Sequence, residues 1–177
     1  MKEKILSSLL TVLAFSALQA QTNSVPAMPR LVVGITIDQF RSDYLEAFAA
    51  LYGNQGFKRL LADGKIYSNV LYGFQHVDRA SALAAIYSGT SPFKNGIVAQ
   101  QWLERSVLRP VFCVDDNNFI GYYTTECTSP QHLLVSTLTD ELEMATKGKS
   151  IVDAIAPYRD AAILAAVHAV DGACGLD

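Results

Sequence analysis

The residue best placed to do chemistry is Asp38, which directly follows an unbroken apolar run, LVVGITI, at 31–37. A run of β-branched and aliphatic side chains without alternation predicts a strand buried on both faces of a parallel sheet. Open α/β sheets bind ligands beyond the carboxyl ends of their strands, where Asp38 falls. Because a carboxylate in apolar surroundings needs a compensating charge, Asp38 is a candidate metal ligand. The alternative is that Asp38 or Ser42 caps a helix beginning near Tyr44.

The side chains that commonly bind metals or form disulfides are scattered along the chain: His76, Cys113, Cys127, His132, His168 and Cys174. None has the spacing of a zinc motif, and we interpret each histidine as a surface or structural residue. Cys113 and Cys127 flank a polar loop and could form a disulfide in an oxidising compartment, which would leave Cys174 unpaired. The alternative is that all three thiols are unpaired.

The helical spacing of apolar residues, and the glycine, serine and proline residues at helix ends, predict the elements that position these residues. Gly64 is expected to end the helix at 57–63 in a left-handed cap. Ser129-Pro130 is expected to begin the helix at 130–147, which stops at Gly148. The predicted buried face of that helix is Leu134, Leu138, Leu142 and Ala145. The predicted helices are 43–51, 57–63, 80–87 and 130–147.

The predicted strands are 31–37, 66–71 and 151–156, while 103–127 reads as irregular and 161–168 as helix or strand. Strands that alternate with helices are typical of an α/β fold with a largely parallel sheet.

Composition places these elements in one exported domain. The chain has 177 residues, 50% hydrophobic, with a net charge of −3, which gives no sign of nucleic-acid binding. Two lysines, a short apolar stretch and Ala20 predict a signal peptide at 1–20, cleaved near Ala20. A polar lead-in at 21–29 precedes the domain at 30–177. We expect no membrane span and a periplasmic or secreted protein.

Three segments together carry a resemblance: LVVGITIDQFRSDYL, IYSGTSPFKNGI and SPQHLLVSTLTDELEMATKGKS. Their order, spacing and residue types resemble the amino-terminal part of the alkaline phosphatase superfamily, in particular the phosphate-irrepressible exported bacterial alkaline phosphatases, which are similar to nucleotide pyrophosphatase/phosphodiesterases. The resemblance runs from about Pro29 to the end. It implies a doubly wound α/β fold sandwiched by helices, here incomplete, and metal-dependent hydrolysis of phosphomonoesters or phosphodiesters. The implied zinc ions assist a threonine or serine alkoxide that attacks phosphorus.

The resemblance makes Asp38 the first metal-ligand aspartate, but the nucleophile position falls on Arg79. Ser81 is a poor substitute, because two residues along a helix rotate a side chain by about 200°. The histidine that the family places after its nucleophile is Leu83 here.

The family's phosphate-contact positions are also substituted. An asparagine that holds phosphoryl oxygens corresponds to Gln100, and a Lys-x-Arg clamp corresponds to Tyr158 and Asp160. An aspartate would repel a phosphate dianion, and Arg159 is one residue out of register.

The remaining zinc ligands of the family come after the position of Asp177, so zinc is implied by resemblance and is not expected to bind to this chain alone. We therefore expect a protein that is inactive as this chain. The alternatives are a pseudoenzyme in which Arg79 contacts an anion, or which binds a protein partner, and the first part of a longer active hydrolase.

Overall fold

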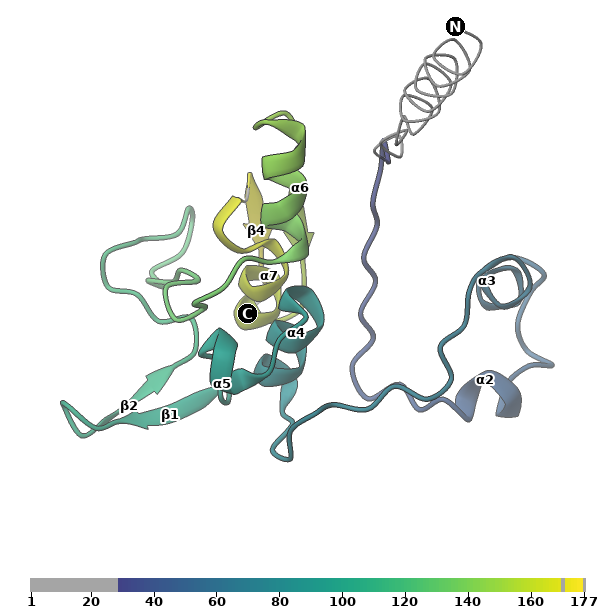
Figure 1. Ribbon diagram of the computed structural model, residues 1–177, viewed down its shortest axis with the longest axis horizontal. Coiled ribbons are helices and arrows are strands. Elements are labelled where there is room, and N and C mark those ends of the chain that lie inside the picture. Colours follow the sequence, from purple (N-terminus) through teal and green to yellow (C-terminus); the bar gives the residue numbers. More distant parts are fainter. Residues whose placement is uncertain (1–28, 170, 177) are drawn as a thin grey trace, which may run out of the picture. The chain divides into compact units, whose positions relative to one another are not determined.

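The computed structural model describes residues 29–169 and 171–176 (Figure 1). The predicted signal peptide at 1–20 and nearly all of the lead-in at 21–29 lie outside the described residues. Among the described residues, no helix has both the length and the apolar content needed to cross a membrane.

The chain divides into two units, and the first, Met1–Gln39, holds the apolar run that precedes Asp38. Residues 31–37 form neither helix nor strand, so the predicted buried strand is wrong. Leu31 and Ile35 are 78% and 77% exposed. A doubly buried strand needs neighbours that bond its backbone and cover its side chains, and the described residues supply no strand that pairs with this run.

The second unit, Phe40–Asp177, begins with two short helices, α2 (Tyr44–Ala47) and α3 (Phe57–Asp63). α3 confirms the helix predicted at 57–63, whereas α2 covers only part of the helix predicted at 43–51. Aromatic rings connect them, since the Phe40 and Phe57 rings stack with centroids 5.4 Å apart. Because neither helix contains a buried residue, this ring cluster is the main packing that the region has.

Gly64 ends α3, but with a φ of −93° and an extended backbone, which corrects the predicted left-handed cap. Glycine is needed there for space, because a Cβ at this position would lie 2.4 Å from the Leu60 carbonyl oxygen. The predicted strand at 66–71 is also wrong: the segment forms no strand, and Val70 and Leu71 are highly exposed. As at 31–37, no described strand pairs with it.

Helix α4 (Arg79–Ser88) begins at a reciprocal cap and confirms the predicted alanine-rich helix. The Asp78 carboxylate accepts the Ser81 backbone N–H at 2.8 Å, and the Ser81 hydroxyl accepts the Asp78 N–H at 3.0 Å. Such a cap satisfies backbone donors that the first turn leaves unpaired. The helix ends at Gly89 in the left-handed conformation (φ 66°), and the short helix α5 (Pro92–Asn95) follows.

An antiparallel hairpin comes next, formed by β1 (Gln101–Glu104) and β2 (Arg109–Phe112). Trp102 lies opposite Val111 in its register. The hairpin lies largely within 103–127, which the sequence predicted to be irregular, so that prediction is wrong for these strands.

Helix α6 (Leu138–Thr146) begins eight residues later than predicted. Its cap is Thr137, whose side chain and backbone N–H bond reciprocally with Asp140. Ser129, the predicted cap, instead donates its hydroxyl to Asp116 at 2.5 Å. The threonine–aspartate pair satisfies two backbone donors at once, which explains why it determines the start.

The predicted buried face of α6 is also wrong. Leu134 precedes the helix and is 72% exposed, Leu138 is 59% exposed, and Ala145 is exposed, whereas Asp140 is buried. The chain leaves the helix at Lys147 and Gly148, both with positive φ, next to the predicted stop.

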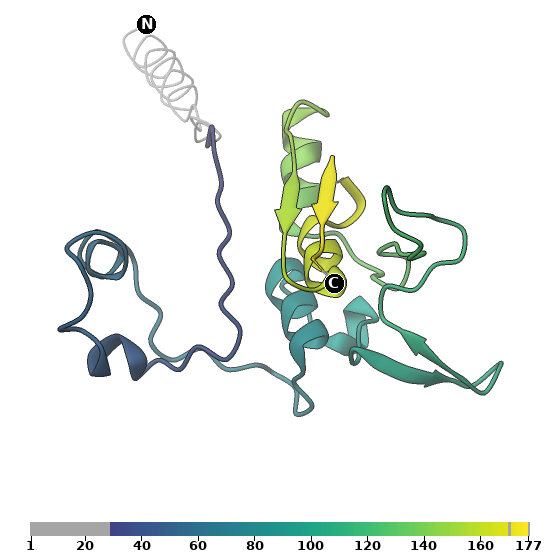
Figure 2. The same cartoon turned by 180° about the vertical axis from the view of Figure 1, so that it is seen from behind.

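The last part of the chain is a strand–helix–strand crossover. Strands β3 (Asp153–Ile155) and β4 (Gly172–Cys174) pair in parallel, joined by α7 (Arg159–Ala166) and the 3₁₀ turn η1 (Val167–Ala169), and Figure 2 shows the two strands side by side. β3 confirms part of the strand predicted at 151–156. The segment left open at 161–168 is helical. A parallel pair with a helical crossover is the unit of an α/β fold.

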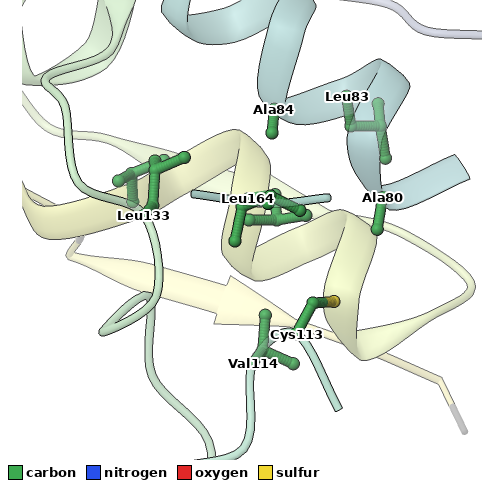
Figure 3. Close-up of a cluster of buried hydrophobic side chains, with 9 residues drawn as sticks. Ala80, Leu83, Ala84, Cys113, Val114, Leu133 and Leu164 are labelled. Carbon is green, nitrogen blue, oxygen red and sulfur yellow. The ribbon is translucent and has the colours of Figure 1, made fainter. Parts of the chain in front are cut away.

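The core lies between α4 and α7. Ala80, Leu83 and Ala84 of α4 face Leu164 of α7, with Leu133 and the β2 end completing the cluster (Figure 3). Small alanines let the two helices approach closely. This packing places the first turns of α4 and α7 beside each other.

Candidate functional site

The first turns of α4 and α7 are joined by an ion pair between Arg79 and Asp160. Arg79 Nε donates to Asp160 Oδ2 at 3.2 Å, and Nη2 donates to Oδ1 and Oδ2 at 3.1 Å each. The Asp160 side chain is 1% exposed and the Arg79 side chain 21% exposed. Two-pronged guanidinium–carboxylate contacts are among the strongest polar contacts in proteins. The candidate site residues Arg79 and Asp160 therefore bind each other.

Tyr158 completes this arrangement from the residue before α7. Its ring lies under the guanidinium, with the Arg79 Cζ 3.8 Å from the ring centroid. A tyrosine face attracts a cation and fixes the plane of the guanidinium. The structure thus brings together Arg79, Tyr158 and Asp160, three of the five candidate site residues. We call these three residues the internal ion-pair cluster.

Gln100 contacts Asp78, the residue next to Arg79, through its backbone. Its N–H donates to Asp78 Oδ2, while Oδ1 of the same carboxylate holds the N–H of Ser81. Ser81 is fully buried, and its hydroxyl lies 2.8 Å from Asp78 Oδ1. Asp78 and Ser81 are therefore committed to capping α4, and no side-chain contact from Gln100 to the cluster is found in the described residues.

Asp38 belongs to the other unit, Met1–Gln39, where it is exposed in a turn. Within the described part of the chain, no three histidine, cysteine, aspartate or glutamate side chains lie close enough to hold a metal ion. The residues present therefore do not fit the zinc site implied by the resemblance, and its formation stays a prediction for the whole protein.

Arg159 points away from the internal ion-pair cluster. It pairs with Glu126 and, at 3.6 Å, with Asp115, and its guanidinium lies 4.6 Å from the centre of the Phe112 ring. These contacts hold the start of α7 against β2 and the loop that follows. Arg159 is thus used in packing and does not replace the missing clamp cation.

Cys113 lies in the core near the same helix starts. Burial, together with the nearby charges of Asp160 and Asp78, raises the pKa of its thiol to about 12. A thiol with so high a pKa carries almost no thiolate at neutral pH and is a poor nucleophile. Cys127 is half-buried and Cys174 exposed, and all three are free thiols in the structure, so the possible disulfide between Cys113 and Cys127 is not formed.

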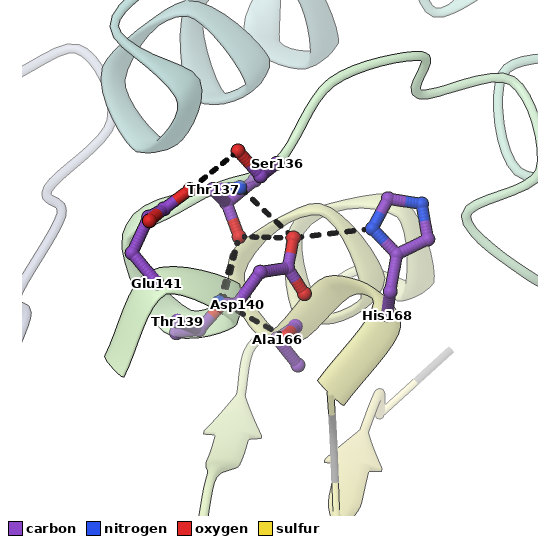
Figure 4. A network of polar contacts seen from close by, with 7 residues as sticks. All are labelled: Ser136, Thr137, Thr139, Asp140, Glu141, Ala166 and His168. Atoms are coloured by element: carbon purple, nitrogen blue, oxygen red, sulfur yellow. Dashed lines mark hydrogen bonds and ion pairs between the residues drawn. The ribbon is translucent and has the colours of Figure 1, made fainter. Parts of the chain in front are cut away.

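His168 takes part in a second polar network, which joins α6 to η1 (Figure 4). Its Nδ1 lies 3.1 Å from Asp140 Oδ2, and the Thr139 hydroxyl donates to the Ala166 carbonyl. Burial opposes ionisation of Asp140, but the hydrogen bonds from His168 and Thr137 outweigh it and hold the pKa of this carboxyl below its usual value. This network fixes two elements and agrees with a structural role for His168.

The cluster also shows what the sequence interpretation missed. Considered separately, Arg79 indicates only a missing nucleophile, and Asp160 only a missing clamp cation. Taken together, position 79 gained a cation where position 160 gained an anion. Opposite charges that appear at two positions expected to face one bound ligand indicate a direct pair, and this signal was available in the sequence.

Comparison with known proteins agrees with the fold. Residues 32–167 match the family described as type I phosphodiesterase / nucleotide pyrophosphatase. The chain belongs to this family, and it corresponds to the amino-terminal part of an alkaline-phosphatase-superfamily protein.

Two relatives show how far the likeness reaches. Alkaline phosphatase PhoV of Synechococcus elongatus is 39% identical, over 100% of this chain and 34% of PhoV. Alkaline phosphatase PafA of Elizabethkingia meningoseptica is 35% identical, over 89% of this chain and 29% of PafA. The chain thus spans about a third of the length of these relatives.

The fold comparison gives the same family. The crystal structure of wild-type PafA superposes with a TM-score of 0.80 at 34% identity, covering 85% of this chain and 30% of PafA. This chain therefore has an incomplete alkaline-phosphatase-like α/β fold. A PafA mutant with a TM-score of 0.81 carries substitutions of a threonine, an asparagine, a lysine and an arginine.

Proposed function

We propose that this chain is an exported member of the phosphodiesterase family that does not hydrolyse phosphate esters, because the internal ion-pair cluster stands in place of the nucleophile and the phosphate clamp. The observation that carries the proposal is the contact between Arg79 and the buried Asp160. Membership of the family supplies the ancestral chemistry, metal-dependent phosphomonoester or phosphodiester hydrolysis.

The chemistry of the substituted side chains supports inactivity. A guanidinium stays protonated and offers no lone pair with which to attack phosphorus. Asp160 contributes a negative charge where the family binds a phosphate dianion with cations, so it opposes substrate binding. Tyr158 supplies no cation to offset that repulsion. Both the attacking group and the clamp are thus replaced.

A second candidate is that these residues are the first part of a longer hydrolase, which the coverage of the relatives favours. Later residues would then supply further zinc ligands. Even so, position 79 would remain an arginine, so an active protein of this kind would need another nucleophile. An immunoblot of the native protein with an antibody against residues 130–150 distinguishes the two, because a band well above 19.2 kDa reveals a longer protein.

The direct test is turnover of p-nitrophenyl phosphate and bis-p-nitrophenyl phosphate by the purified chain, with and without added zinc. We expect no turnover above buffer under either condition. The matched variant is Asp38→Asn, which removes the one predicted ligand. Zinc-dependent turnover by the unaltered chain that disappears in Asp38→Asn would contradict the proposal.

A further inference from the structure

We propose that Asp160 is an internal anion: its carboxylate fills an oxyanion site formed by Arg79 at the start of α4, and so closes that site to external phosphate. The inference rests on the proposed function, since it concerns the same positions. It adds a ligand class, a tetrahedral oxyanion, and names the group that excludes it.

The donors of Arg79 already have the arrangement that an oxyanion needs. Nε and Nη2 both face the two oxygens of Asp160, at 3.1 to 3.2 Å. The guanidinium fork binds carboxylate and phosphate oxygens with the same donors. Tyr158, 3.8 Å beneath, holds the plane of that fork in place. A phosphate ion would therefore meet preformed donors if the carboxylate were absent.

Helix polarity explains why an anion is required here. Arg79 is the first residue of α4, where the partial positive charge of the helix start disfavours a cation. A neighbouring negative charge removes this penalty. Asp160, in the first turn of α7, supplies it from a position that itself favours an anion. An external oxyanion would serve the same purpose.

Burial shows which partner is accessible. The Asp160 side chain is 1% exposed, whereas the Arg79 side chain is 21% exposed and can be reached from solvent. The other nearby carboxylate, Asp78, already accepts the N–H groups of Ser81 and Gln100. Asp160 is therefore the group whose removal opens the guanidinium to a ligand.

The test is a calorimetric titration with inorganic phosphate. The three proteins compared are the unaltered chain, Asp160→Ala, and the double variant Arg79→Gln/Asp160→Ala. Alanine suits the first turn of α7 and removes both the charge and the volume of the carboxylate. We expect no saturable binding by the unaltered chain, binding at least about tenfold tighter by Asp160→Ala, and loss of that binding in the double variant.

Two outcomes would overturn the inference. One is phosphate binding by the unaltered chain as tight as that of Asp160→Ala; the other is a folded Asp160→Ala variant that binds none. If Asp160→Ala does not melt cooperatively, Asp160→Asn replaces it, because it keeps the volume and removes the charge. Phosphate should then raise the Tm of Asp160→Asn but not that of the unaltered chain, and equal effects would refute the idea. Turnover bears on the proposed function alone, so the two failures are distinguishable.

Discussion

At the scale of single residues, the internal ion-pair cluster links stability to the loss of catalytic groups. Asp160 is almost fully buried, so its charge depends on Arg79 for compensation. A buried carboxylate that loses its partner is much more costly than an exposed one. Arg79 is therefore a structural residue as well as a candidate site residue.

We predict that Arg79→Ala lowers the free energy of unfolding by about 3–5 kcal/mol, because it leaves Asp160 buried without its partner. Urea denaturation followed by circular dichroism measures the change. The matched control is Arg41→Ala, which breaks an exposed pair with Asp43 and should cost less than about 1 kcal/mol. Equal losses in the two variants would contradict the structural role of Arg79.

A second prediction concerns the cysteines. With a thiol pKa of about 12, Cys113 should resist alkylation at pH 8 in the folded chain, where about one thiol in ten thousand is ionised. Cys174 is exposed and should react rapidly. Iodoacetamide labelling followed by peptide mass spectrometry tests this. Modification of Cys113 as fast as that of Cys174, without prior unfolding, would show that the thiol is not buried.

At the scale of helices and strands, predictions succeeded where the signal was local. The alanine-rich run before Gly89 identified α4, because helix propensity and a left-handed glycine act within a few residues. The β1–β2 hairpin was missed because its turn has no glycine or asparagine; Leu108 adopts positive φ instead, with φ 51°. The start of α6 was misplaced because Ser129-Pro130 resembles a helix start, while Thr137 forms the cap.

The cap of α6 gives a third prediction. Thr137→Ala should destabilise the chain by about 1 kcal/mol and reduce helicity at residues 138–140, since it removes the hydroxyl that accepts the Asp140 N–H. Thermal melts and ¹³Cα chemical shifts report the two effects. Ser129→Ala is the comparison, and its helical shifts at 138–140 should stay unchanged. The reverse pattern would place the start of the helix at Ser129.

At the scale of the whole molecule, the resemblance predicted the fold class that the comparison with PafA shows. The strands predicted at 31–37 and 66–71 do not form in this chain, because a strand depends on partners elsewhere in the sequence. In the candidate site, the sequence located positions 79, 158 and 160, but their mutual contact depends on how α4 packs against α7. The local pattern of either helix alone does not contain that information, which only the opposite charges at positions 79 and 160, taken together, indicate.

Export gives a fourth prediction at this scale. If residues 1–20 are a signal peptide, the native protein should begin at Gln21, because Ala20 offers the small side chain that cleavage requires. Amino-terminal sequencing of protein recovered outside the cytoplasm measures this. Replacing the predicted cleavage residue, Ala20→Arg, should leave the segment attached. A native protein that retains Met1 would contradict export by this route.

The bidentate contact between Arg79 and Asp160 also has an evolutionary consequence. Changing position 79 alone to threonine would leave the buried Asp160 carboxylate without its partner, so the free energy of unfolding would fall before any activity could return. Reverting position 160 to arginine first would place two cations together at the starts of two helices, which is also unfavourable. Each single step back is selected against, although the combined change is not. Strong epistasis between two codons more than eighty positions apart would therefore preserve the inactive state that we propose.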